Sequence, residues 1–212
     1  MPQPSVPDDN DDHILIFGLI LEFALILITF AVGYAFSVDV RKWLIPQVSN
    51  AIFGVIATIP LYALFLILWY RSPRWMLDER EFLIETLGRP LSEIGVFGCF
   101  LLATMAGIGE EYFFRGALQT LFSWPMGLWG GILIANIIFA LMHYVSFSYA
   151  SFAFAAGLYF SLLDQSGLIY PALSGTGEPT RNLLAPIISH GLYDFLAFVH
   201  VSAAWKARQA NL

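Results

Sequence analysis

Apolar residues along this chain fall into long runs that short polar segments separate. The runs cover residues 14–36, 48–70, 92–122, 130–144, 151–163 and 183–204. About 20 apolar residues in an α-helix cross the hydrocarbon core of a bilayer, and a helix satisfies its own backbone hydrogen bonds there. A Trp-Pro-Met-Gly turn at residues 124–127 separates the third run from the fourth. The pattern predicts an all-α, polytopic transmembrane helical bundle of about six spans.

The segments between and around these runs are polar, and the longest of them contains its own helical pattern. Residues 78–87 have apolar positions at helical spacing and are followed by Gly88. They predict a short amphipathic helix that ends there and lies among lipid headgroups beside Trp75. We divide the chain into a disordered acidic tail, two N-terminal transmembrane helices, an interfacial loop with its helix, a catalytic transmembrane core and a C-terminal tail, at residues 1–13, 14–70, 71–91, 92–204 and 205–212.

Composition supports a membrane protein and argues against some partners. Of the 212 residues, 58% are hydrophobic and 12% are charged, whereas about a quarter of a soluble domain is charged. The net charge of −6 comes largely from an acidic N-terminus, so nucleic acid is not an expected partner. The partners we expect are the lipid bilayer and a substrate within it. Cys99 is the only cysteine, which excludes an intrachain disulfide.

Basic residues in the short loops predict how the chain is oriented. With six spans, the side that holds both termini and residues 71–90 has six Lys and Arg residues, and the other side has three. Arg115 falls within the membrane. Because basic loops stay on the cytoplasmic side, we expect a multi-pass integral membrane protein with both termini in the cytoplasm.

Three charges in one apolar run are the main chemical signal. Glu110, Glu111 and Arg115 lie inside the third span, where charge is costly and marks function. On a helix Glu111 and Arg115 stand four residues apart, with the acid first, which favours an ion pair. That pair leaves Glu110 without a local partner. A lone carboxylate in a poorly hydrated site is a candidate general base.

Four further polar residues lie on later spans. Asn136 and His143 share a helical face, and so do His190 and Asp194. Glu110 and His143 are each about sixteen residues from the turn at residues 126–127, or roughly 24 Å along two helices, so they should meet at equal depth. His190, only a few residues into its span, would lie nearer the opposite side unless the last helix starts farther in than Leu183 or one of the span boundaries is wrong. On the first span, Glu22 is interpreted as a carboxylate paired in the bundle or hydrated near an interface.

These motifs resemble those of a known family. The Glu-Glu-x-x-x-Arg of residues 110–115, the Phe-x-x-x-His of 139–143 and the His-x-x-x-Asp of 190–194 are similar, in that order, to the motifs of the CAAX-protease and bacteriocin-processing (Abi) glutamic intramembrane proteases. The resemblance covers residues 95–199 and implies a helical bundle around a polar intramembrane cavity. It also implies endopeptidase activity, without a cofactor, on a membrane-anchored protein or peptide.

The resemblance implies a role for each motif residue. Glu110 would activate water with the help of His143, His190 and Asp194 would support the oxyanion, and Glu111 and Arg115 would hold the shape of the first motif. An ionised Asp194 cannot donate a hydrogen bond, so it would either be protonated or orient His190. The stretch 168–181 is an insertion where the family has a tight turn, which leaves the register of the last helix open.

Two other functions remain open. The first is a zinc-dependent hydrolase that uses Glu110, Glu111, His143 and His190 as ligands, although the helical His-Glu-x-x-His motif of zinc proteases is absent. The second is a non-catalytic immunity protein or scaffold with the same fold. No serine or cysteine stands in a recognisable nucleophile motif.

Overall fold

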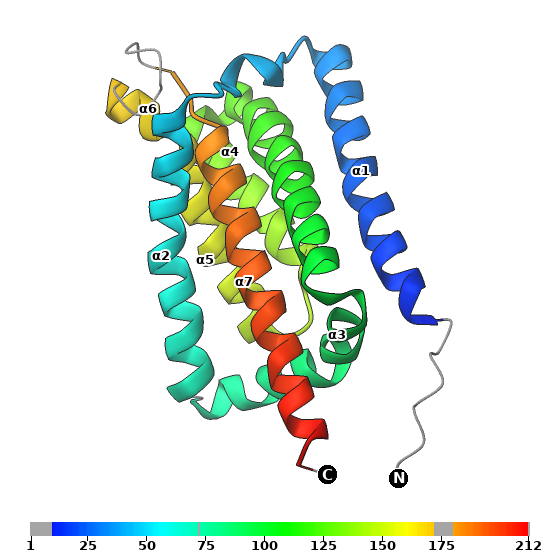
Figure 1. Cartoon of the computed structure of the whole chain (residues 1–212). Helices are drawn as coiled ribbons and strands as arrows, with labels where there is room; N and C mark the ends of the chain where they lie inside the picture. The colour runs from blue at the N-terminus through cyan, green and yellow to red at the C-terminus, as the bar shows by residue number, and fades with distance from the viewer. Residues whose placement is uncertain (1–9, 72, 172–179, 212) are drawn as a thin grey trace.

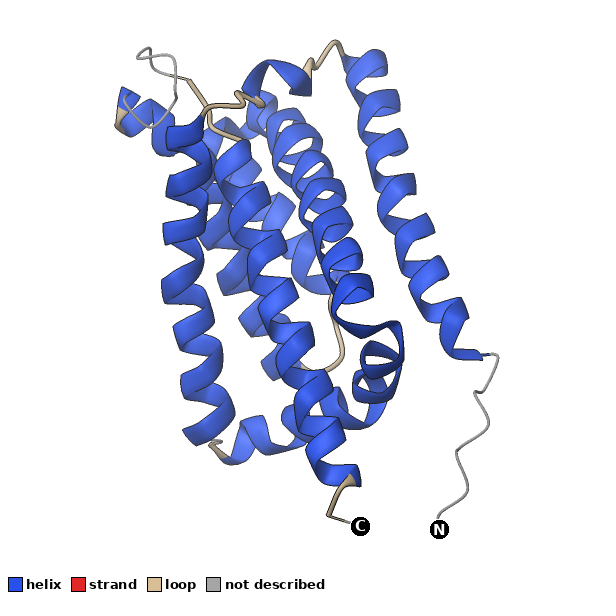
Figure 2. Cartoon of the chain, in the orientation of Figure 1, coloured by secondary structure: helices blue, strands red, loops and turns tan. Residues whose placement is uncertain are grey.

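The computed structural model describes residues 10–71, 73–171 and 180–211, and within them every regular element is a helix (Figures 1 and 2). This confirms the predicted all-α fold. The elements are α1 Asn10–Phe36, η1 Val40–Trp43, α2 Val48–Arg71, α3 Arg74–Glu110, the π-helical η2 Glu111–Gln119, α4 Thr120–Met142, α5 Phe147–Asp164, α6 Ser166–Ile169 and α7 Leu184–Gln209.

Four described stretches are long and apolar enough to cross a membrane, namely Ile16–Phe36, Val48–Arg71, Met76–Met142 and Leu184–Gln209. The third bends at Gly95 and Gly127, whose φ angles of 66° and 73° strain any residue with a Cβ. Its second and third arms run up and down the bundle, and α5 runs beside them, which gives about six passes. The first helix begins and the last helix ends at the same end of the bundle (Figure 1). Which side of a membrane that end faces stays a prediction.

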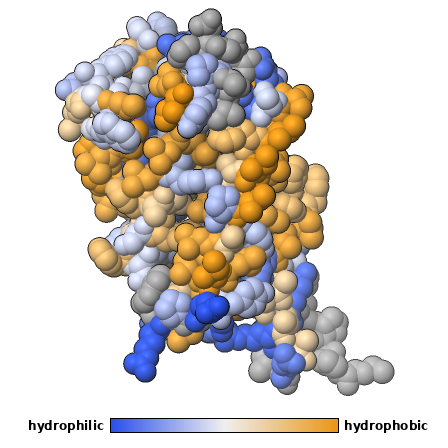
Figure 3. Space-filling model, turned by 90° about the vertical axis from the view of Figure 1, so that its left-hand side faces the viewer, coloured by the Kyte–Doolittle hydropathy of each residue, from blue (hydrophilic) through white to orange (hydrophobic). Residues whose placement is uncertain are grey.

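Apolar side chains on the outside of the bundle form the surface that a bilayer would cover. Phe17, Ile59, Phe97 and Trp129 are each between 64% and 72% exposed. Figure 3 shows a broad hydrophobic zone over the middle of the molecule and hydrophilic residues gathered at its lower end. An exposed apolar area of this extent marks a lipid-facing surface, and the protein is an integral membrane protein.

Helix boundaries differ from the prediction at both ends of the chain. Residues 10–13, predicted to be disordered, are the first turn of α1, and residues 205–209, predicted as a tail, continue α7. Residues 1–9 and 212 lie outside the described part. The C-terminal turn of α7 is helical because its side chains have partners: Trp205 packs on Gly88, and Arg208 forms ion pairs with Glu81 and Glu85.

The predicted end of the short helix at residues 78–87 is wrong, because the helix does not stop at Gly88. Helix α3 passes through Gly88 without interruption and changes direction at Gly95 instead. Gly88 is used for close packing, since a Cβ there would lie 2.6 Å from the Cβ of Trp205. On this arm Leu83 and Leu91 are buried against α2 and α7. The arm therefore closes one end of the bundle with its apolar face.

Two glycines of α3 bring this helix into direct backbone contact with its neighbours, Gly107 with α7 and Gly109 with α1. A Cβ on Gly107 would lie 2.8 Å from the backbone nitrogen of Gly191. Likewise, a Cβ on Gly109 would lie 2.7 Å from the carbonyl oxygen of Glu22 on α1. Such small residues let membrane helices approach closely. Gly109 precedes Glu110 and Gly191 follows His190 in the sequence, so this packing places the motif residues together.

Candidate active site

The first motif stands where α3 changes into the π-helical stretch η2. Glu110 is the last residue of α3, and Glu111 is the first of η2. Insertions of π-helix are rare and are found frequently at functional sites. Both Glu111 and Arg115 are buried, with side chains 0% and 1% exposed. The two glutamates therefore differ in surroundings, since Glu110 lines a cavity and Glu111 is enclosed by protein.

Glu111 and Arg115 form the ion pair that their spacing predicts. Arg115 Nη1 donates to Glu111 Oε1 at 2.9 Å. Its Nη2 donates to the carbonyl oxygen of Gly157 at 2.8 Å and to Asn136 Oδ1 at 3.3 Å. Asn136 in turn donates to Ser161 Oγ at 2.9 Å. The network ties η2 to α4 and α5, which gives Arg115 and Asn136 a structural role.

Glu110 is left with two histidines as its neighbours. Its Oε1 lies 3.7 Å from Nε2 of His143, and its Oε2 lies 3.9 Å from Nε2 of His190. Oε2 is buried and makes no hydrogen bond to any described residue. These distances are too long for direct hydrogen bonds and short enough for one bridging water. The structure thus brings Glu110 and His143 together as their equal spacing from the turn predicts.

Hydrogen bonds to the far nitrogen fix how each histidine ring is turned. Nδ1 of His143 lies 2.8 Å from the carbonyl oxygen of Phe139, and Nδ1 of His190 lies 2.8 Å from Glu111 Oε1. A carbonyl or carboxylate oxygen only accepts, so both Nδ1 atoms carry hydrogen. Both Nε2 atoms therefore point toward Glu110. Phe160 stacks on the His190 ring, with centroids 4.5 Å apart.

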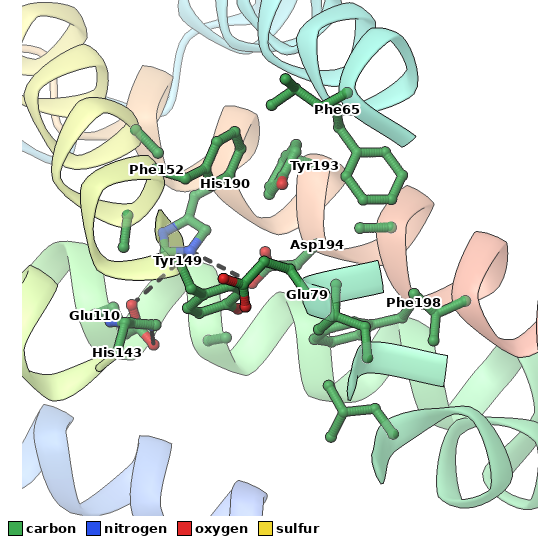
Figure 4. A pocket seen from close by; sticks show the side chains of 18 of the residues that line it. Phe65, Glu79, Glu110, His143, Tyr149, Phe152, His190, Tyr193, Asp194 and Phe198 are labelled. Atoms are coloured by element: carbon green, nitrogen blue, oxygen red, sulfur yellow. Dashed lines mark ion pairs between the residues drawn. The ribbon is translucent and has the colours of Figure 1, made fainter. Parts of the chain in front are cut away.

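Asp194 lies beside His190 rather than on its own in the cavity. Its Oδ2 is 3.4 Å from Nε2 of His190. Figure 4 shows that Asp194 and Glu110 both face this one nitrogen of the His190 ring. The arrangement favours the interpretation in which Asp194 orients His190.

His190 reaches the depth of Glu110 because the last helix, which begins at Leu184, starts inside the bundle, as one of the two alternatives from the sequence allowed. The backbone N–H of Asn182 donates to the carbonyl oxygen of Asp164 at 2.8 Å, and that of Leu183 donates to Trp43 at 3.0 Å. Both residues are 0% exposed. The last helix therefore begins inside the bundle, and six further residues bring His190 level with Glu110.

A cavity of about 270 Å³ opens beside these residues. Its walls include Glu110, His143, His190 and Asp194 (Figure 4). Apolar side chains, among them Leu83 and Leu91 on the first arm of α3, form other parts of its wall. No lysine or arginine is among the described residues that line it. The cavity therefore places Glu110 beside mostly apolar walls.

The sequence pattern did not assign five polar residues of the cavity wall to the site: Glu22, Glu79, Ser148, Tyr149 and Tyr193. Glu22 is 7% exposed, and its Oε2 makes no hydrogen bond to a described residue, which disfavours the paired alternative and leaves the hydrated one as a prediction. Its position inside a span was the available signal. Glu79 lies in the segment predicted to cover the headgroups, and the tyrosines lie among many other aromatic residues. Only the fold shows that they face Glu110.

No group of three or more His, Cys, Asp and Glu side chains suited to hold a metal ion is found among the described residues. A zinc site needs several ligand atoms at about 2.0–2.2 Å from one point. Cleavage in excess EDTA, and its recovery with zinc, tests whether this protein uses a metal ion.

The fold and this constellation define a class, a polytopic helical membrane protein with a glutamate–histidine site inside the bundle. The chain belongs to the Rce1-like family, described as type II CAAX prenyl endopeptidase Rce1-like, whose model matches residues 92–196. A comparison with curated proteins and one with solved structures each found no match. The matched region contains all three motifs. Membership supports a CAAX-protease-like endopeptidase at the level of the family.

Proposed function

We propose that this protein hydrolyses a peptide bond in a membrane-anchored protein or peptide, with water activated by Glu110. The observation that carries the proposal is the placement of Glu110 on the cavity wall. Its carboxylate lies 3.7 and 3.9 Å from two histidine nitrogens, while the adjacent Glu111 is neutralised by Arg115. A general base within one water of its partners has the geometry that proton abstraction needs.

The reaction balances with these residues alone. A water held between Glu110 and Nε2 of His143 gives one proton to Glu110, and its oxygen attacks the scissile carbonyl carbon. The carbonyl oxygen becomes an oxyanion. When the tetrahedral intermediate collapses, the C–N bond breaks and Glu110 returns its proton to the leaving amine. The net change is the addition of one water, with no covalent enzyme intermediate.

The substrate enters from the apolar part of the cavity in this proposal. The name of the family specifies prenyl CAAX endopeptidases, and apolar walls at Leu83 and Leu91 suit a lipid-modified or otherwise apolar peptide. A suitable probe is an internally quenched peptide that ends in a farnesylated Cys-aliphatic-aliphatic-X sequence.

Glu110→Gln tests the proposal, because the amide keeps the shape of the side chain and cannot take a proton. We expect the purified variant to stay folded and to lose about 10²–10⁴-fold in rate, while wild type cleaves the probe in excess EDTA. Glu85→Gln is a control, because Glu85 is exposed at the end of the bundle. Chelator-sensitive cleavage restored by zinc would assign the same residues to a metal hydrolase instead. Absence of cleavage of farnesylated and unmodified membrane peptides would favour a scaffold.

A further inference from the structure

The proposed reaction develops negative charge on the substrate carbonyl oxygen, and both ring nitrogens of the histidine in the third motif face carboxylates. Asp194 as a carboxylate only accepts. Nδ1 of His190 is held by Glu111 at 2.8 Å, and its Nε2 faces Asp194 at 3.4 Å. The cavity wall also carries Glu22, Glu79 and Glu110. An oxyanion formed among these carboxylates needs a positioned donor from elsewhere.

Tyr149 on α5 is a neutral donor on the same cavity wall. The carboxylates of Glu110, Asp194 and Glu79 line the same cavity as this phenol. In the view of Figure 4 it lies between the His143–Glu110 pair and the Asp194–Glu79 pair. Its hydroxyl makes no hydrogen bond to any described residue and is therefore available to an acceptor that enters the cavity.

The backbone around Tyr149 holds the ring in a fixed place. Ser146 caps α5, and its Oγ accepts a hydrogen bond from the Tyr149 backbone N–H at 3.0 Å. The same Oγ donates to Glu79 Oε1. The ring packs against the buried cluster around Phe65 and Val201. A donor that is fixed before the substrate arrives needs no reorganisation during the reaction.

Tyr193 is the other phenol on the cavity wall, and it is less well placed. Its ring contacts that of Phe65 edge-on, with centroids 6.2 Å apart, and in the view of Figure 4 it lies on the Phe65 side of His190, away from Glu110. A donor to the oxyanion must lie near the general base, because the base activates the water that attacks the carbonyl carbon and the donor binds the oxygen of the same carbonyl group. This comparison selects Tyr149.

We propose that Tyr149 is a further catalytic residue, whose hydroxyl donates a hydrogen bond to the oxyanion that forms when Glu110-activated water attacks. The proton stays on the phenol, so no bond of Tyr149 is made or broken. This inference rests on the proposed hydrolysis and adds a donor that none of the three motifs contains.

Tyr149→Phe removes only the hydroxyl, and Tyr159→Phe is the matched control. Tyr159 lies on the same helix, and its hydroxyl donates to the carbonyl oxygen of Ala57 at 2.7 Å, away from the cavity wall. With the farnesylated probe we expect Tyr149→Phe to lower kcat by about 10²–10³-fold, as the loss of one oxyanion donor does. KM should change less than about twofold, and the shape of the pH–rate profile should be unchanged, because the titrating base is Glu110. Tyr159→Phe should keep the wild-type kcat.

A second readout does not depend on turnover. A peptide aldehyde hydrates to a tetrahedral form that copies the intermediate, so its binding should weaken in Tyr149→Phe in parallel with kcat/KM. The melting temperature should not fall, since the lost hydroxyl has no partner in the fold.

The outcomes separate the inference from the proposed function. Wild-type kcat in Tyr149→Phe together with an inert Glu110→Gln would overturn the role of Tyr149 and leave hydrolysis by Glu110 intact. A raised KM at constant kcat would also overturn it, because that pattern marks substrate binding alone. A marked fall in melting temperature would show a structural role for the hydroxyl and count against the inference. Inactive wild type would refute both statements.

Discussion

Replacement of Arg115 by alanine should destabilise the protein before it affects the chemistry. Arg115 and Glu111 are buried at 1% and 0% side-chain exposure and joined at 2.9 Å. Removing one partner of such a pair leaves an uncompensated buried charge and typically costs about 3–5 kcal/mol. The carbonyl oxygen of Gly157 loses its donor as well, and an unsatisfied buried acceptor costs about 1–3 kcal/mol. We therefore expect a loss near the upper end of the first range.

The measurement is unfolding of detergent-solubilised protein, compared with a surface pair of the same spacing and distance but with the base first. Arg89 and Glu93 are also four residues apart and 2.9 Å from each other, but their side chains are 38% and 36% exposed. Arg89→Ala should cost no more than about 1 kcal/mol, because exposed pairs are screened by solvent. The difference between the two variants isolates the effect of burial.

A double variant separates folding from activity. Glu111→Gln combined with Arg115→Met removes both charges, so much of the lost stability should return. Activity should stay low, because the neutral amide of Gln binds Nδ1–H of His190 more weakly than the carboxylate of Glu111 does. The reasoning is refuted if Arg115→Ala unfolds like wild type and is as inactive as Glu110→Gln, since Arg115 would then act in the reaction itself.

Two further predictions concern helix packing at Gly107 and the cap of η1 at Asp39. Gly107→Ala should lower both kcat and the melting temperature, because its Cβ would lie 2.8 Å from backbone atoms of α7; equal activity and stability would show that the helices separate without consequence. Asp39 accepts hydrogen bonds from Arg41 and caps η1, and this hydrogen bond lowers the pKa of the Asp39 carboxyl below its ordinary value. A lowered pKa adds stability above the unfolded-state pKa that is lost as pH falls through the folded-state value. Thermal unfolding across pH should thus show wild type above Asp39→Asn near neutrality, with the gap closing in acid; a constant gap would contradict this.

The sequence was sufficient for the spans and for the convergence of Glu110 with His143. Both depend on spacing along helices, and the turn at Gly127 fixes the two helices that carry them. It was not sufficient for the depth of His190, because a hydropathy boundary does not reveal that Leu183 starts its helix inside the bundle. It also could not distinguish Gly88, which makes room for Trp205, from Gly95, which has the positive φ.

The walls of the cavity were the least predictable part. Glu22 is on α1, far along the chain from the three motifs, and it reaches Gly109 only through the packing of α1 on α3. Tyr149 follows His143 by six residues, and its direction depends on the cap at Ser146. Contacts between distant helices decide these positions, and a single sequence carries no record of them.

The anchor at the start of α7 also bears on how this fold tolerates change. Arg181 donates to Asp164 Oδ2 at 2.9 Å, to Thr120 Oγ1 at 2.7 Å and to the carbonyl oxygen of Arg115 at 2.6 Å. The backbone bonds of Asn182 and Leu183 add to this attachment. The register of His190 is thereby fixed by residues 181–183 themselves and not by the length of chain that precedes them. Insertions and deletions between α6 and Arg181 can accumulate during evolution while the histidine keeps its place opposite Glu110.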